Sequence, residues 1–157
     1  MARRHKAEQR KLIPDPRYGN EMVSYMINSV MSRGKKSTAA KIVYGAIEDI
    51  QNQMKDKDPI EVFTQAIINV SPRLEVKSRR VGGATYQVPL EVKPKRQIAL
   101  AVRWLIQFSG NRKGMPMRKA LAIELMDAYR GQGNAIKKRD DTHKMAQANK
   151  AFAHYRW

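Results

Sequence analysis

The side chains best placed to do chemistry lie near the carboxyl end of the chain. Asp140 and His143 are three residues apart, and Asp141 lies between them. On a helix, a carboxylate and an imidazole one turn apart could act as a general-base pair or contribute to a metal site. Lysines flank this stretch on both sides, however, so local ion pairing is the simpler interpretation.

The rest of the sequence offers little for catalysis. His5 and His154 are the only other histidines, and the chain has no cysteine, so thiolate zinc sites and cysteine nucleophiles are excluded. The sequence lacks GxxxxGK[ST], HExxH and nucleophile-elbow motifs. A nuclease is therefore a rival interpretation without a convincing catalytic constellation. We predict a protein that is not an enzyme, with no metal, cofactor or small-molecule substrate.

Charge is the strongest compositional signal. The 157 residues include 31 Lys and Arg against 14 Asp and Glu, a formal net charge of +17. Such a chain repels itself when compact, and a polyanion relieves that repulsion while counterions are released. Nucleic acid is the leading partner and an anionic membrane the second. No apolar run approaches transmembrane length, and no signal-peptide core follows the amino terminus, so we expect a soluble, intracellular protein.

Apolar spacing predicts six helices in one domain that covers residues 1–157. The expected helices cover residues 20–31, 37–54, 58–70, 94–109, 116–129 and 134 onward. Asn20 is a suitable amino-terminal cap, and Asp58 with Pro59 forms a compact helix start. Residues 1–18 are rich in Lys and Arg and are interrupted by prolines, which indicates a basic arm that orders on RNA.

The last helix and tail, residues 134–157, differ from the others. The apolar stripe is thin and lies among many lysines. We expect this helix to pack on little of its own domain and to lie against RNA or another protein.

The stretch "VKSRRVGGATYQV" at 76–88 predicts a β-hairpin among the helices. A three-residue loop of Gly82, Gly83 and Ala84 puts every apolar residue on one face, whereas a two-residue loop divides them between two faces. We therefore predict the three-residue loop. Its pairs would be Arg80 with Tyr86, Ser78 with Val88, Val76 with Leu90, and Leu74 with Val92.

The base of this two-stranded ribbon is suited to packing and its tip to nucleic acid. Arg79 and Arg80 lie beyond the part that could be buried, and Tyr86 could stack on a base or pack against Arg80. The alternative is an ordinary surface hairpin with solvated arginines. A DNA-binding helix-turn-helix around Lys35 and Lys36 is a further alternative, but basic residues spread over arm, ribbon and loops suit an irregular RNA surface better.

Residues 20–46, "NEMVSYMINSVMSRGKKSTAAKIVYGA", closely match the signature of the family of ribosomal protein seven of the small subunit, bacterial type. The resemblance extends along the chain through "RRVGGATYQVPLEV" at 79–92 and "DTHKMAQANKAFAHYRW" at 141–157. It implies a mainly α, six-helix domain with one antiparallel β-ribbon, at residues 73–93, protruding between the third and fourth helices. It also implies a cytoplasmic, ribosomal location and a primary RNA-binding role in assembly of the subunit head.

The resemblance also assigns residues to two surfaces. The expected ribosomal-RNA-binding residues are Arg3, Arg4, Lys6, Arg10, Lys11, Lys35, Lys36, Lys77, Lys95, Arg96, Arg112, Lys113 and Met115. The residues expected near the exit-site transfer RNA and the messenger RNA path are Arg79, Arg80, Gly82, Gly83, Ala84 and Tyr86. The last helix would face neighbouring components that include ribosomal proteins nine and eleven. Members of the family can also repress their own messenger RNA.

Overall fold

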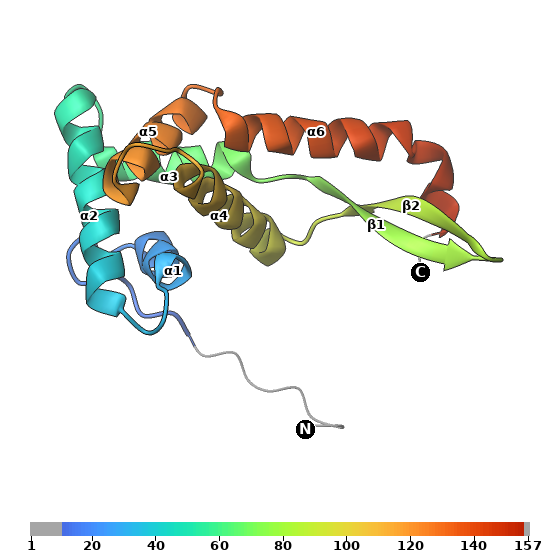
Figure 1. Cartoon of the computed structure of the whole chain (residues 1–157), viewed down its shortest axis with the longest axis horizontal. Coiled ribbons are helices and arrows are strands. Elements are labelled where there is room, and N and C mark those ends of the chain that lie inside the picture. Colours follow the sequence, from blue (N-terminus) through green and yellow to red (C-terminus); the bar gives the residue numbers. More distant parts are fainter. Residues whose placement is uncertain (1–10, 156–157) are drawn as a thin grey trace.

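Six α-helices and one two-stranded ribbon make up residues 11–155, the part of the chain described by this computed structural model (Figure 1). The elements in chain order are α1 Glu21–Val30, α2 Lys36–Gln53, α3 Pro59–Val70, β1 Leu74–Val81, β2 Ala84–Glu91, α4 Pro94–Gly110, α5 Met117–Tyr129, α6 Asn134–Ala148 and the 3₁₀ helix η1 Lys150–Tyr155. The predicted fold class is confirmed. η1 was not predicted, and residues 1–10 of the basic arm lie outside the described residues.

Local capping chemistry sets where several helices begin. The Asn20 side chain accepts a hydrogen bond from the Met22 amide at 2.7 Å, and Asp58 accepts one from the Ile60 amide at 3.1 Å. Both predicted caps are confirmed, with Pro59 in the first helical turn of α3. In contrast, α2 begins at Lys36 and not at the expected Ser37, and no side chain caps it.

The helical body is built around α5, which packs against α2, α3 and α4. Its fully buried side chains come from all of these helices, as in Ile47, Phe63, Leu105 and Leu121. Burial of one such side chain contributes about 1.5–3 kcal/mol. The predicted apolar stripes of these helices therefore face one shared core.

A buried carboxylate joins this body to the carboxyl-terminal helix. Glu124 on α5 is 1% exposed. Its Oε2 accepts hydrogen bonds from the Arg112 guanidinium at 2.6 and 3.1 Å, and its Oε1 accepts one from the Ala135 amide at 3.0 Å. Arg112 also pairs with Asp127 at 2.8 Å. Glu124 thus supplies the cap that α6 lacks within its own sequence, while it holds the α4–α5 loop.

Gly133 makes this arrangement possible. Its φ of +93° lies in the left-handed region, and a Cβ at this position would lie 3.1 Å from Asp127 Cβ and 3.3 Å from Glu124 Oε1. Any side chain there would press on the carboxylates that hold Arg112. The chain therefore turns into α6 through a glycine.

α6 leaves the body and lies alongside the ribbon (Figure 1). Ala135, Ile136, Thr142 and Ala146 are buried along it, so the expectation that this helix packs on little of its own domain is wrong. The physical reason is position: Ala135 and Ile136 join the core of the body at the start of α6, and the helix then contacts both strands of the ribbon. The Arg139 guanidinium also donates to the backbone carbonyl of Asn69, at the end of α3.

The ribbon has a two-residue turn, and the predicted three-residue loop is wrong. Leu74 pairs with Glu91, Val76 with Pro89, and Lys77 with Val88. The earlier pairs Arg80–Tyr86, Ser78–Val88, Val76–Leu90 and Leu74–Val92 therefore do not form. Gly82 and Gly83 both have positive φ, +57° and +91°, as in the turns whose twist matches that of a hairpin.

The predicted register fails because it requires one covered face, whereas both faces of the ribbon base are partly covered. Leu74 and Val76 are half-buried on one face, while Val88 is buried and Leu90 half-buried on the other. Since both faces of the ribbon base are partly covered, the division of apolar residues between them carries little cost.

Aromatic packing holds the distal part of the ribbon. The Tyr86 ring lies 5.1 Å, centroid to centroid, from both Phe152 and Tyr155 of η1. Tyr86 pairs across the ribbon with Arg79, so its expected packing against Arg80 is wrong. Strand side chains alternate between faces, which places Arg80 on the opposite side of the ribbon.

No helix within residues 11–155 is both long enough and apolar enough to cross a membrane.

Substitution Glu124→Gln tests the buried junction. We expect it to lower the free energy of unfolding by about 1.5–3 kcal/mol, because the charged acceptor of the Arg112 hydrogen bonds is lost. Urea denaturation measures this change. The exposed Glu91 is the matched control, and Glu91→Gln should stay within about 0.5 kcal/mol of the parent. Equal effects of the two substitutions would contradict the role given to Glu124.

Candidate nucleic-acid interface

The arginines with carboxylate partners act as internal cross-links. These ion pairs are Arg17–Glu48 at 2.9 Å, Arg96–Glu75 at 2.8 Å, Arg112–Glu124 at 2.6 Å, Arg118–Asp49 at 2.6 Å and Arg139–Asp140 at 2.6 Å. Each carboxylate that accepts a planar guanidinium in this way holds one segment of chain to another or to its own helix. Each pair cancels one negative charge against one arginine, so these carboxylates do not neutralise the exposed lysines.

Asp140 and His143 both make contacts within the protein. Asp140 pairs with Arg139, so local ion pairing holds, although with an arginine in place of a lysine. The Nε2 atom of His143 accepts a hydrogen bond from the Arg73 amide at 3.0 Å, just before β1. Within the described residues, no three His, Asp or Glu side chains lie close enough to hold a metal ion.

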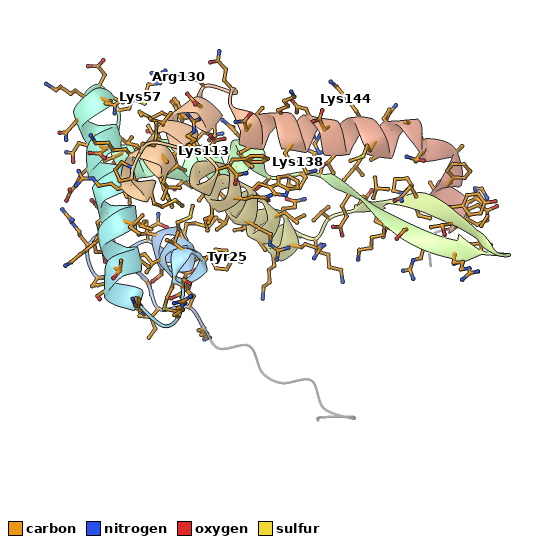
Figure 2. The ribbon with its side chains drawn as sticks, viewed as in Figure 1. Tyr25, Lys57, Lys113, Arg130, Lys138 and Lys144 are labelled. Carbon is orange, nitrogen blue, oxygen red and sulfur yellow. The ribbon has the colours of Figure 1, made fainter. Side chains whose placement is uncertain are left out.

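Many exposed cations make no ion pair within residues 11–155. They lie in the α1–α2 turn, on α2 and α4, in the α4–α5 loop and on the outer side of α6: Arg33, Lys35, Lys36, Lys41, Arg103, Lys113, Lys137, Lys138 and Lys144. Figure 2 shows Lys113 on the α4–α5 loop and Lys144 on α6. Most are lysines, whose compact ammonium groups suit phosphate contacts that need no fixed angle.

Three helices begin with cations where negative charge would be more stable. α2, α4 and α5 have no side-chain cap and no acidic residue in the first turn. Lys36 begins α2, and Lys95 and Arg96 lie in the first turn of α4. Positive side chains at the positive end of a helix dipole cost about 0.3–1 kcal/mol each, and a nearby anion removes that cost.

The predicted RNA-binding residues fall into two groups, those that are exposed and those that pair with carboxylates. Lys35, Lys36 and Lys113 are exposed, and Met115 is 38% exposed. Arg112 instead turns inward to Glu124 and Asp127. Arg96 pairs with Glu75 at 2.8 Å and so joins α4 to the ribbon base, while Lys77 lies 3.6 Å from the same carboxylate within β1. Arg3, Arg4, Lys6 and Arg10 lie outside the described residues, whereas Lys11 is exposed.

The ribbon tip lies at the end of the ribbon away from the helical body (Figure 1). Arg80 and the segment from Gly82 to Ala84 are exposed, while Arg79 and Tyr86 are half-buried. The tip can therefore present one arginine and glycine backbone to a ligand, and Tyr86 serves as its aromatic anchor to η1.

A groove between α1 and α4 was missed from the sequence. One stretch, of about 710 Å³, is lined by Lys11, Leu12, Glu21, Met22, Tyr25, Lys95 and Ile98. A second, of about 510 Å³, is lined by Tyr25, Ser29, Ala99, Arg103, Ile106 and Gln107. Tyr25 borders both. Its position beside the apolar stripe of α1 resembles a core residue, so only the placement of α4 shows that it borders open space.

Comparisons with a protein-family model and with known proteins point to the same family. The family described as ribosomal protein S7p/S5e matches residues 2–150 of the chain. The small ribosomal subunit protein uS7 of Sorangium cellulosum (strain So ce56) is 58% identical over 157 residues, which is all of both chains. The protein of the same name from Thermotoga neapolitana is 57% identical over 155 residues, 99% of each chain, and that of Methylobacterium radiotolerans is 56% identical over the full length of both.

The pH dependence of stability tests the His143 contact. Burial, followed by the charge of Arg139, lowers the pKa of His143 from its usual 6.5; Asp140 opposes this shift and Arg73 adds to it. The unfolded chain then binds more protons than the folded one between pH 7.5 and 5.5, so stability should fall on acidification. Urea denaturation at both pH values measures the loss.

His143→Gln should make the same curve flatter over that range, since the titrating group is removed. If the free energy of unfolding of His143→Gln still falls as steeply between pH 7.5 and 5.5, His143 is not the titrating group.

Proposed function

The chain belongs to the ribosomal protein S7p/S5e family, and from that membership we propose that it is a primary binder of ribosomal RNA that nucleates folding of the head of the small subunit. The family makes it a structural component of the small ribosomal subunit, in the cytoplasm of bacteria. The observation that carries the finer proposal is the division of its cations, in which arginines hold the fold and exposed lysines surround helix starts that no side chain caps.

The proposed mechanism is equilibrium binding without bond chemistry. Cations in the α1–α2 turn, at the start of α4 and in the α4–α5 loop neutralise phosphates from several RNA segments, which would otherwise repel one another. The arginine cross-links hold these sites at fixed separations before RNA arrives, so less order has to be created on binding. Selectivity comes from the shape of the RNA, because charge alone discriminates poorly.

We assign a separate role to the ribbon. Its tip is proposed to lie beside the exit-site transfer RNA and the messenger RNA path. Exposed Arg80 supports this role, as do the glycines that let backbone approach a ligand closely. The outer side of α6, with exposed lysines and Met145 at 48% exposure, is proposed to face neighbouring proteins, including ribosomal proteins nine and eleven.

The salt dependence of RNA binding tests the lysine surface. Log affinity against log salt should have a slope of about 0.7–0.9 per phosphate neutralised, so Lys35→Gln with Lys36→Gln should reduce the slope by about 1.4–1.8. Filter binding to small-subunit ribosomal RNA at four salt concentrations measures it. The control is Lys55→Gln. Lys55 lies beyond the other end of the 18-residue α2, about 27 Å from Lys36. An unchanged slope in the double variant would remove the α1–α2 turn from the interface.

Charge reversal at the ribbon tip tests the division between body and ribbon. We expect Arg80→Glu to weaken transfer-RNA binding at the exit site of assembled subunits several-fold, with little effect on assembly of subunits from RNA and protein. The control is Arg130→Glu, in the exposed α5–α6 turn far from the ribbon (Figure 2). If assembly fails while transfer-RNA binding persists, the division is wrong.

A further inference from the structure

Tyr25 stands apart from the other tyrosines of the chain. There are six, and all lie within the described residues. Five have a ring or hydroxyl partner: Tyr44 donates to Asp15, Tyr129 accepts from Lys57, Tyr18 lies edge-on to Tyr44, and Tyr86 and Tyr155 pack together. Tyr25 has no ring contact, cation contact or hydroxyl hydrogen bond within residues 11–155.

Open space begins beside this ring. Tyr25 is half-buried against the core, and it borders both stretches of the groove between α1 and α4. Figure 2 shows Tyr25 on the side of α1 toward α4. The two stretches measure about 710 and 510 Å³. Both volumes lie within the range of about 300–1,000 Å³ that small-molecule sites occupy.

The lining of the groove combines an apolar surface with cations. Leu12, Met22 and Ile98 line the first stretch together with Lys11 and Lys95. Arg103, which makes no ion pair within the described residues, lines the second. An aromatic ring between cationic groups is the combination that binds single-stranded nucleic acid, since the ring takes a base and the cations take the flanking phosphates.

We propose that this groove holds one unpaired nucleotide of the ribosomal RNA, with its base stacked on Tyr25. The inference rests on the proposed function and adds to it a defined subsite. The phosphates on either side of the base lie toward Lys11 and Arg103. A duplex cannot present a base face in this way, so the nucleotide comes from a loop, bulge or junction.

Glu21 gives the subsite a base preference. Among residues 11–155, it is the only carboxylate that lines either stretch. A carboxylate accepts hydrogen bonds and repels phosphate, so at this position it favours a base with an exocyclic amino group over uracil. Adenine, guanine and cytosine carry such a group.

The matched pair Tyr25→Leu and Tyr25→Phe tests the stacking. We expect Tyr25→Leu to weaken binding to small-subunit ribosomal RNA about 5- to 150-fold, the effect of losing one base–aromatic stack. Tyr25→Phe keeps the ring and should stay within about threefold of the parent. The salt slope should be unchanged in both variants, because a stack releases no counterions, whereas Arg103→Gln should lower it by about 0.7–0.9.

Two measurements keep this test decisive. Thermal denaturation shows whether Tyr25→Leu is folded, and ultraviolet cross-linking of the parent protein to the RNA should join the Tyr25 peptide to one unpaired nucleotide. A cross-link to a paired nucleotide, or equal affinity of a folded Tyr25→Leu variant, would overturn the subsite. Tyr25 should also react with iodine in the protein alone, and a ring that is fully protected there would overturn the subsite too.

Failure of the subsite is distinct from failure of the proposed function. If the parent protein binds small-subunit ribosomal RNA no better than duplex DNA at physiological salt, the proposed function fails. If the parent binds the RNA well and folded Tyr25→Leu binds it with equal affinity, only the subsite fails.

Discussion

The buried carboxylate of Glu124 is the interaction on which the arrangement of the molecule depends. It accepts the guanidinium of Arg112 and the amide of Ala135, and so joins the α4–α5 loop, α5 and the start of α6 at one point. A lone buried charge would be costly, and here its hydrogen bonds and the nearby cation offset that cost. From this junction α6 runs along β1, and η1 beyond it packs on Tyr86. The direction of the ribbon is thus set by α6 along its length and by η1 at its distal part.

The second constraint is charge. A net charge of +17 destabilises a compact chain, yet the internal arginine–carboxylate pairs use carboxylates that would otherwise screen the surface. The arginine pairs link segments of the body, and most exposed lysines make no ion pair within residues 11–155. The same division that stabilises the fold therefore concentrates positive potential outside it. In the proposed function, binding to RNA would relieve both the repulsion and the unfavourable charges at the starts of α2 and α4.

Features encoded within a few residues could be predicted from the sequence. The caps at Asn20 and Asp58 and the buried stripes around Phe63 and Leu121 depend on local spacing, and they were found. The ribbon register could not be found in this way, because it depends on α6 and η1, which cover the ribbon from more than forty residues away in the sequence. Likewise, Arg112 was expected on the RNA-binding surface and proved to be an internal partner, and the groove beside Tyr25 was not predicted. In each case the missing information was the position of another element.

We propose that preformed cationic sites on one rigid body hold several segments of ribosomal RNA together. Hydroxyl-radical footprinting of small-subunit ribosomal RNA, with and without the protein at physiological salt, tests this claim most directly. We expect sharp protection at several sites that are far apart in the RNA sequence and meet in the subunit head. Protection of a single short helix, or weak protection spread evenly along the RNA, would contradict it.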